Sequence, residues 1–229
     1  MKPILFNTEM VTALLEGRKT VTRRIIKPQP RENAEMRYVF AGGRKSDIGK
    51  WHDWQQGVTD AQKWNPPYHA DDILYVRETW CVGKVDFGEE PDGRCVPFIS
   101  QCTGENDIIQ KEWAIREGIG IEDVVWRPSI HMPKEAARIF LRVKSVRVER
   151  LQKCGDGWCV DIEKEGVKTP QDPILYVNDD RFHAALRAEM KKLWDSTIKP
   201  TELDTYGWDA NPWVWVIEFE KISKEEALK

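Results

Sequence analysis

The chain has 229 residues, a formal net charge of -3 and a pI near 5.9, and 41% of its residues are hydrophobic. This composition can build a sizeable core, but it lacks the broad basic excess typical of proteins that coat duplex DNA or a membrane surface. Any contact with nucleic acid should therefore be local. No run approaches the roughly 18 consecutive apolar residues of a membrane-spanning helix, so we expect no membrane partner.

Cysteine usage indicates a reducing compartment. The five cysteines are an odd number without a compact framework, and the first residues carry no apolar core of a signal peptide. We therefore expect a cytoplasmic protein with reduced thiols. A zinc site would need four close ligands, and the sequence has no pair of C-x-x-C elements, so we predict no metal. The cysteines are Cys81, Cys95, Cys102, Cys154 and Cys159.

The N-terminal part of the chain predicts a strand, a helix and a second strand. "PILF" is short and apolar, and the following "NTEMVTALLEG" has its apolar residues at helical spacing, with Asn7 as N-cap and Gly17 as the C-terminal stop. "KTVTRRIIK" is rich in β-branched residues and should be extended until the two prolines of "KPQP" end it. The helix therefore leads directly into a basic segment.

Two long polar stretches, at about 31–70 and 82–133, interrupt the regular pattern and are predicted to be large insertions. Between them, "DDILYVRETW" contains a continuous apolar run at 73–76, which predicts a strand buried on both faces. The second insertion contains a candidate short helix around "IIQKEWAIREG".

The C-terminal part predicts two long strands and two helices. "RIFLRVKSVRVER" alternates apolar and basic residues, with a change of phase near Ser145 that indicates a β-bulge. "VDIEKEG" is a short helical candidate, residues 180–198 carry an apolar stripe at helical spacing, and "WVWVIEFEKI" is a final strand. We predict one α+β domain over 1–229, a mixed β-barrel of about five or six strands with flanking helices.

The basic segment "EGRKTVTRR" allows two interpretations. It could be a solvated edge strand with protective charges. Alternatively, Lys19 could lie in a half-buried turn where burial and the neighbouring arginines lower its pKa, so that it activates the Thr22 hydroxyl. Residues three apart in a flat strand point to opposite faces, so the second interpretation needs a turn near Gly17.

Gly17, Lys19 and Arg24 resemble the G-x-K-x-x-E-x-R signature of the ASCH domain, a relative of the PUA RNA-binding barrel. Thr22 stands where the signature most often has Glu, and "GRKTVTRR" is similar to the small ASCH enzymes that hydrolyse N4-acetylcytidine. In those enzymes a Lys, a Thr and a distant Glu are catalytic. The resemblance implies Lys19, Thr22 and a glutamate of "DIEKEGV", with Glu165 as the better match and Glu163 as the alternative.

Other blocks extend the resemblance and supply candidate substrate contacts. "DDILYVRETW" and "PWVWVIEF" resemble ASCH strands, and the whole chain resembles the longer ASCH proteins of phages and prophages. "RETW" ends a buried strand, and "WRPSIHMP" is a proline-stiffened loop suited to a lid or a base-contacting finger. A structural ion pair of Arg77 with Glu78 is an alternative for the first motif. The candidate substrate-binding residues are Arg23, Arg24, Arg77, Glu78, Trp80, Ser129, His131 and Trp215.

Together these features predict a protein that binds a modified nucleoside or single-stranded RNA, with hydrolysis of the N4-acetylcytidine amide as its reaction if it is an enzyme. The resemblance implies no cofactor, and "FAGGRKSDIGK" lacks P-loop spacing, so no nucleotide triphosphate is expected. Two alternatives stay open: a non-catalytic RNA- or nucleotide-binding module of a phage or prophage, and a metal-independent ribonuclease that uses His131 and Lys19.

Overall fold

The computed structural model describes residues 1–39, 48–54, 63–89, 93, 95–100, 108–120, 124–155, 160–168 and 179–229. The chain is α+β and folds into two compact units, each assembled from separated stretches of sequence. The first unit contains Met1–Gly17, Ile73–Arg142 and Lys221–Lys229, and the second contains Arg18–Asp72 and Val143–Glu220.

The first unit is built on strands β1, β6 and the start of β11, hydrogen bonded in that order. β1 runs parallel to β6, and β6 runs antiparallel to β11, with Tyr75 opposite Phe140. The buried middle of β6 confirms the strand predicted from its apolar run. Helix α1 is capped by the Asn7 side chain, which accepts from the Met10 backbone, as predicted. The elements are β1 Lys2–Leu5, α1 Thr8–Leu15, β6 Ile73–Arg77, β11 Phe140–Arg150 and α7 Lys224–Ala227.

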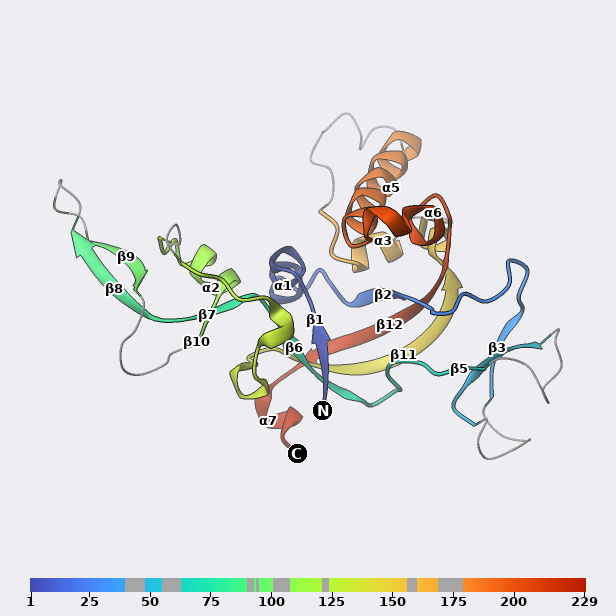
Figure 1. Ribbon diagram of the computed structural model, residues 1–229, viewed down its shortest axis with the longest axis horizontal. Coiled ribbons are helices and arrows are strands. Elements are labelled where there is room, and N and C mark those ends of the chain that lie inside the picture. Colours follow the sequence, from blue (N-terminus) through green and yellow to red (C-terminus); the bar gives the residue numbers. More distant parts are fainter. Residues whose placement is uncertain are drawn as a thin grey trace. The chain divides into compact units, whose positions relative to one another are not determined.

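The second predicted insertion, at 82–133, contains more regular structure than its sequence indicates. β7 pairs with β10, and β8 forms an antiparallel hairpin with β9 (Figure 1). The helix predicted around "IIQKEWAIREG" is present as α2. The elements are β7 Trp80–Val82, β8 Lys84–Glu89, β9 Cys95–Ser100, β10 Ile108–Gln110, α2 Lys111–Arg116, and two 3-10 helices at Ser129–His131 and Lys134–Ala136.

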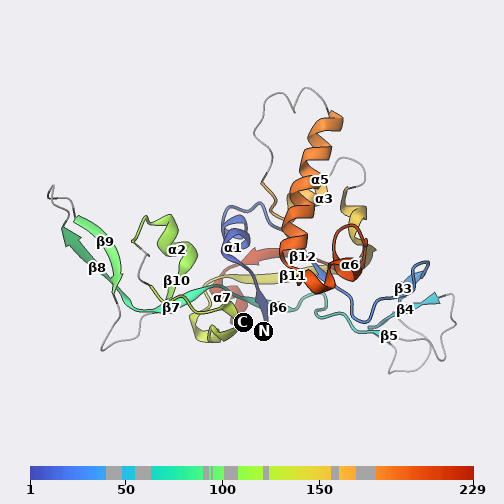
Figure 2. The same cartoon turned by 45° about the horizontal axis from the view of Figure 1, so that its top comes forward.

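The second unit is built on β2, β12 and most of β11, in the order β11-β12-β2. β12 runs antiparallel to β2, with Thr22 opposite Ile217. Helices α3, α5 and α6 lie on one side of β2 and β12 in both views (Figures 1 and 2). The elements are β2 Val21–Ile25, α3 Val160–Lys164, α5 Asp179–Ser196, α6 Leu203–Tyr206 and β12 Trp213–Ile222, with 3-10 helices at Leu151–Gly155 and Pro200–Glu202.

The core of the second unit joins this helical layer to the strands. Apolar side chains of α5, such as Leu186 and Met190, pack with Val214 and Val216 of β12, and Val21 of β2 belongs to the same cluster. Part of the first predicted insertion, at 31–70, forms a small antiparallel sheet of β3 Met36–Tyr38, β4 Trp51–Asp53 and β5 Lys63–Trp64. The described strands form open sheets, and no closed barrel is found among them.

Candidate active site

The turn that the basic segment requires lies just before β2. Gly17 adopts a left-handed conformation with φ 76°, which glycine tolerates without strain, and it ends the segment led by α1. Lys19 then forms an isolated antiparallel bridge with Glu165, and Thr20 N donates to Lys164 O at 2.9 Å. The regular strand begins only at Val21. Lys19 is therefore held by this bridge, outside the flat strand.

The Lys19 ammonium is buried and donates three hydrogen bonds. Its acceptors are the backbone carbonyls of Val21 and Glu165, both at 2.8 Å, and Glu165 Oε2 at 2.9 Å. Lys19 and Glu165 are each only 4% exposed, although 146 residues separate them in sequence. Three acceptors match the three protons of a charged ammonium, so the resting pair is an ion pair.

Glu165 lies where the chain leaves helix α3. Glu165 N donates to Ile162 O, and Gly166 follows with φ 84°, so the helix ends at this point. Glu163, the alternative glutamate, is exposed, whereas Glu165 is buried against Lys19. The structure therefore places Glu165, and not Glu163, beside the lysine.

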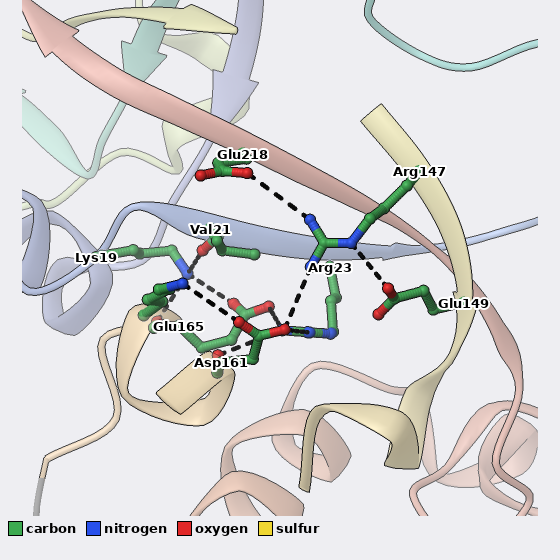
Figure 3. A network of polar contacts seen from close by, with 9 residues as sticks. Lys19, Val21, Arg23, Arg147, Glu149, Asp161, Glu165 and Glu218 are labelled. Atoms are coloured by element: carbon green, nitrogen blue, oxygen red, sulfur yellow. Dashed lines mark hydrogen bonds and ion pairs between the residues drawn. The ribbon is translucent and has the colours of Figure 1, made fainter. Parts of the chain in front are cut away.

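Arg23 completes the buried cluster from strand β2. Its Nη1 donates to Glu165 Oε1 at 2.9 Å, so the two carboxylate oxygens contact different cations. Its Nη2 lies 3.6 Å from Asp161 Oδ2, one helical turn before Glu165. Arg23 Nε and Nη2 have no hydrogen-bond acceptor within the described part of the chain. Figure 3 shows Glu165 held between Lys19 and Arg23.

The pKa values of the two cations that contact Glu165 shift in opposite directions. Burial lowers the pKa of Lys19; the charge and hydrogen bond of Glu165 oppose this shift, and the charges of Arg24 and Arg23 add to it. Burial also disfavours the charged form of Arg23, but the charges of Glu165, Cys154 and Asp161 and the Glu165 hydrogen bond together raise its pKa. Burial likewise lowers the pKa of Arg24. In Lys19 and Arg24, therefore, burial favours the neutral form.

The lowered pKa of Lys19 predicts a pH-dependent contribution to stability. Between that value and the ordinary 10.5, the unfolded chain binds more protons at this residue, so the free energy of unfolding rises with pH. A Lys19→Met variant lacks this contribution and leaves Glu165 with one cation fewer. We expect the stability advantage of the unmodified protein over this variant to grow as pH rises from 7 to 10, measured by urea denaturation. An advantage that shrinks over this range would contradict the assignment.

The other candidate residues of this unit lie along β2 and β12. Thr22 is 3% exposed, and the Lys19 ammonium contacts the Val21 carbonyl immediately before it. Arg24 is opposite Trp215 in the strand register. The Trp215 ring is buried edge-on to Trp51, with centroids 6.4 Å apart, so this indole packs against the small sheet.

The candidates of the first unit form a separate cluster in which "RETW" and "WRPSIHMP" meet. Trp80 and Arg127 exchange backbone hydrogen bonds of 3.2 and 2.7 Å, and the Arg127 guanidinium lies 5.1 Å from the Trp80 ring centroid. Arg77 Nη1 donates to Ile130 O at 3.1 Å. Ser129 and His131 lie in the 3-10 helix of this loop.

Glu78 is paired with Arg138, 60 positions further along the chain, and not with the neighbouring Arg77 that the sequence suggested as its ion-pair partner. Glu78 is 1% exposed and accepts two hydrogen bonds from Arg138, at 2.9 and 2.8 Å. Arg138 Nη2 also donates to Glu112 at 2.8 Å, so one guanidinium serves two buried carboxylates. Glu78 is therefore a structural residue of the first unit, because both of its oxygens are used inside the protein.

Sequence reasoning missed the charged residues around the Lys19–Glu165 pair. Asp161 accepts from Arg147 Nη2 at 3.2 Å, and Arg147 Nε donates to Glu149 at 2.8 Å (Figure 3). Arg147 Nη1 also lies 3.8 Å from Glu218. Asp161 could have been found from its spacing, because residues four apart on a helix lie on one face and Asp161 precedes Glu165 by four.

The described ranges contain no group of three or more His, Cys, Asp or Glu side chains placed to hold a metal ion. Cys81, Cys95 and Cys154 are free thiols, and Cys102 and Cys159 lie outside these ranges. None of the helices in them combines the length and the apolar character needed to cross a bilayer.

The resemblance to the ASCH domain rests on the sequence motif around Lys19. No protein-family model matches the chain, and neither the search of curated proteins nor that of solved structures found a significant match.

Proposed function

We propose that this protein is an ASCH-type, PUA-like protein of the cytoplasm that binds a modified nucleoside and hydrolyses the amide of N4-acetylcytidine. The observation that supports the proposal is the buried contact between Lys19 and Glu165, 2.9 Å long. An amine with a lowered pKa in direct contact with a carboxylate can supply a base and an acid to the same reaction.

The reaction starts when the proton shared by the pair moves to Glu165. Neutral Lys19 then accepts a proton from Thr22 or from a water that Thr22 orients, and that oxygen attacks the acyl carbon. Glu165 donates its proton to the exocyclic nitrogen as the C–N bond breaks, which restores the ion pair. Water is consumed overall, directly or by hydrolysis of a Thr22 ester, and the products are acetate and cytidine. Because all three Lys19 protons are donated in the resting state, substrate entry must open one of these contacts.

Variants of Thr22 test the proposal and identify the nucleophile. Release of cytidine from N4-acetylcytidine should fall about 10²-fold or more in Thr22→Val, which replaces the hydroxyl with a methyl group. Thr22→Ser keeps a hydroxyl and should retain most of the activity. Short RNA is assayed in parallel for fragment release. Equal rates for Thr22→Val and the unmodified protein would remove Thr22 from the mechanism, and RNA fragments without cytidine release would identify a ribonuclease.

A non-catalytic binder is the second candidate, and the saturated Lys19 ammonium favours it. A lysine whose three protons are all bound within the protein holds the strand to the helix. In that case the partly exposed cations of the basic segment, Arg18 and Arg24, would contact phosphates of RNA, and the affinity for RNA would fall steeply with salt. Binding of a neutral nucleoside would change little with salt, so titrations at two salt concentrations distinguish the two candidates.

A further inference from the structure

Asp161 is the residue through which the buried pair connects to the surface. Its carboxylate faces Arg23 at 3.6 Å, Arg147 at 3.2 Å and Lys164 at 3.5 Å, and its side chain is 33% exposed. Asp161 and Glu165 are four residues apart and both face Arg23. One guanidinium therefore faces two carboxylates, Glu165 at Nη1 and Asp161 at Nη2.

Arg147, on strand β11, contacts the same Asp161 carboxylate at 3.2 Å. Its side chain is 32% exposed and is shared among three carboxylates, those of Asp161, Glu149 and Glu218. An arginine beside Asp161 offsets the charge that this carboxylate presents to Arg23. Glu165 in turn accepts from both Arg23 and Lys19, at 2.9 Å each, so a change at Arg23 reaches the Lys19 amine through this one carboxylate.

We propose that Asp161 and Arg147 are positioning residues that set how the Glu165 carboxylate is divided between Arg23 and Lys19. Neither residue contacts the Lys19 amine directly in the described structure; both act through Arg23. Of the two tests below, only the kinetic one rests on the proposed function. The charged and titratable groups that face the cluster are Lys19, Arg23, Arg24, Glu149, Cys154, Asp161, Lys164, Glu165 and Glu218, together with Arg147.

Two variants should change the Lys19 amine in opposite directions. Asp161→Asn removes the second carboxylate from Arg23, so Arg23 holds Glu165 more tightly and the pKa of Lys19 falls. Arg147→Gln leaves Asp161 to attract Arg23, so Glu165 is left more fully to Lys19 and the pKa of Lys19 rises. Each change removes one partly screened charge near the cluster, so both shifts should exceed the scatter of repeated titrations. Both residues are partly exposed, so both variants should fold.

The measurement is the ¹⁵N resonance of the Lys19 amine as a function of pH, which needs no substrate and is therefore independent of whether the protein is an amidase. At pH 7, the Arg23 guanidinium resonances should also move in opposite directions in the two variants. Lys144→Gln is the matched control, because it removes a cation from the same strand at a residue paired with Glu220, and it should move neither signal. Asp161→Glu keeps the carboxylate charge, so its Lys19 and Arg23 signals should match those of the unmodified protein.

Catalysis supplies a second readout if the amidase activity is present. The pH at which kcat/KM reaches half of its plateau should move with the same signs as the Lys19 resonance. Unchanged Lys19 and Arg23 signals in both variants would overturn the inference. Shifts of the same sign in Asp161→Asn and Arg147→Gln would also overturn it, as would an Asp161→Glu variant that behaves like Asp161→Asn.

Discussion

Replacing Glu165 with alanine should lower the free energy of unfolding by about 3–5 kcal/mol, the usual cost of removing one partner from a buried ion pair. The reason is the charge left behind. Lys19 and Arg23 would remain buried beside each other without the carboxylate that accepts from both of them. Urea denaturation at pH 7 measures the loss, and cytidine release should be abolished in the same variant.

Helix α3 supplies a matched control for this prediction. Glu163→Ala removes the same side chain from an exposed position two residues earlier, and its effect on unfolding should stay within about 0.5 kcal/mol. If the two alanine variants lost equal stability, the buried contact of Glu165 would not be the source of the effect.

The second large effect is expected in the first unit, at Arg138. Arg138→Met should cost about 3 kcal/mol of unfolding free energy, because Glu78 and Glu112 would keep their buried charges without a cation. Thermal and urea denaturation at pH 7 measure the loss.

Two further variants separate the charge effect from the loss of packing. Arg116→Met removes an exposed arginine paired with Glu117, and it should cost less than about 1 kcal/mol. Adding Glu78→Gln and Glu112→Gln to Arg138→Met removes the uncompensated charges and should recover part of the lost stability. A triple variant less stable than Arg138→Met alone would show that buried charge is not the main cost.

Local signals explain which elements the sequence could predict. Asn7 and Gly17 bracket α1 because capping and a left-handed turn depend on a few neighbouring residues. The long strands β11 and β12 and helix α5 also lie where their periodicity predicts them. The strands of the small sheet and of the β8–β9 hairpin were not predicted, because most of them are too short for a clear alternating pattern.

Buried charges were the least predictable feature of both units. A glutamate in "KEWAIREG" has the pattern of a solvated helix face, yet Glu112 is 4% exposed and bound to Arg138. Sequence periodicity also could not choose between Glu163 and Glu165, because that choice depends on where α3 ends. The contact of Lys19 with Glu165 was implied by the family resemblance alone, and the catalytic roles of both residues stay a prediction.

In the proposed function, the Lys19 amine, held by Glu165, activates the nucleophile of an amide hydrolysis. The most direct test is the rate of cytidine and acetate release from N4-acetylcytidine by the unmodified protein and by Lys19→Met, with folding of the variant verified by circular dichroism. We predict turnover by the unmodified protein and a loss of roughly 10²- to 10⁴-fold in the variant, the usual contribution of a general base. Equal rates in a folded variant, or no release by the unmodified protein, would contradict the account.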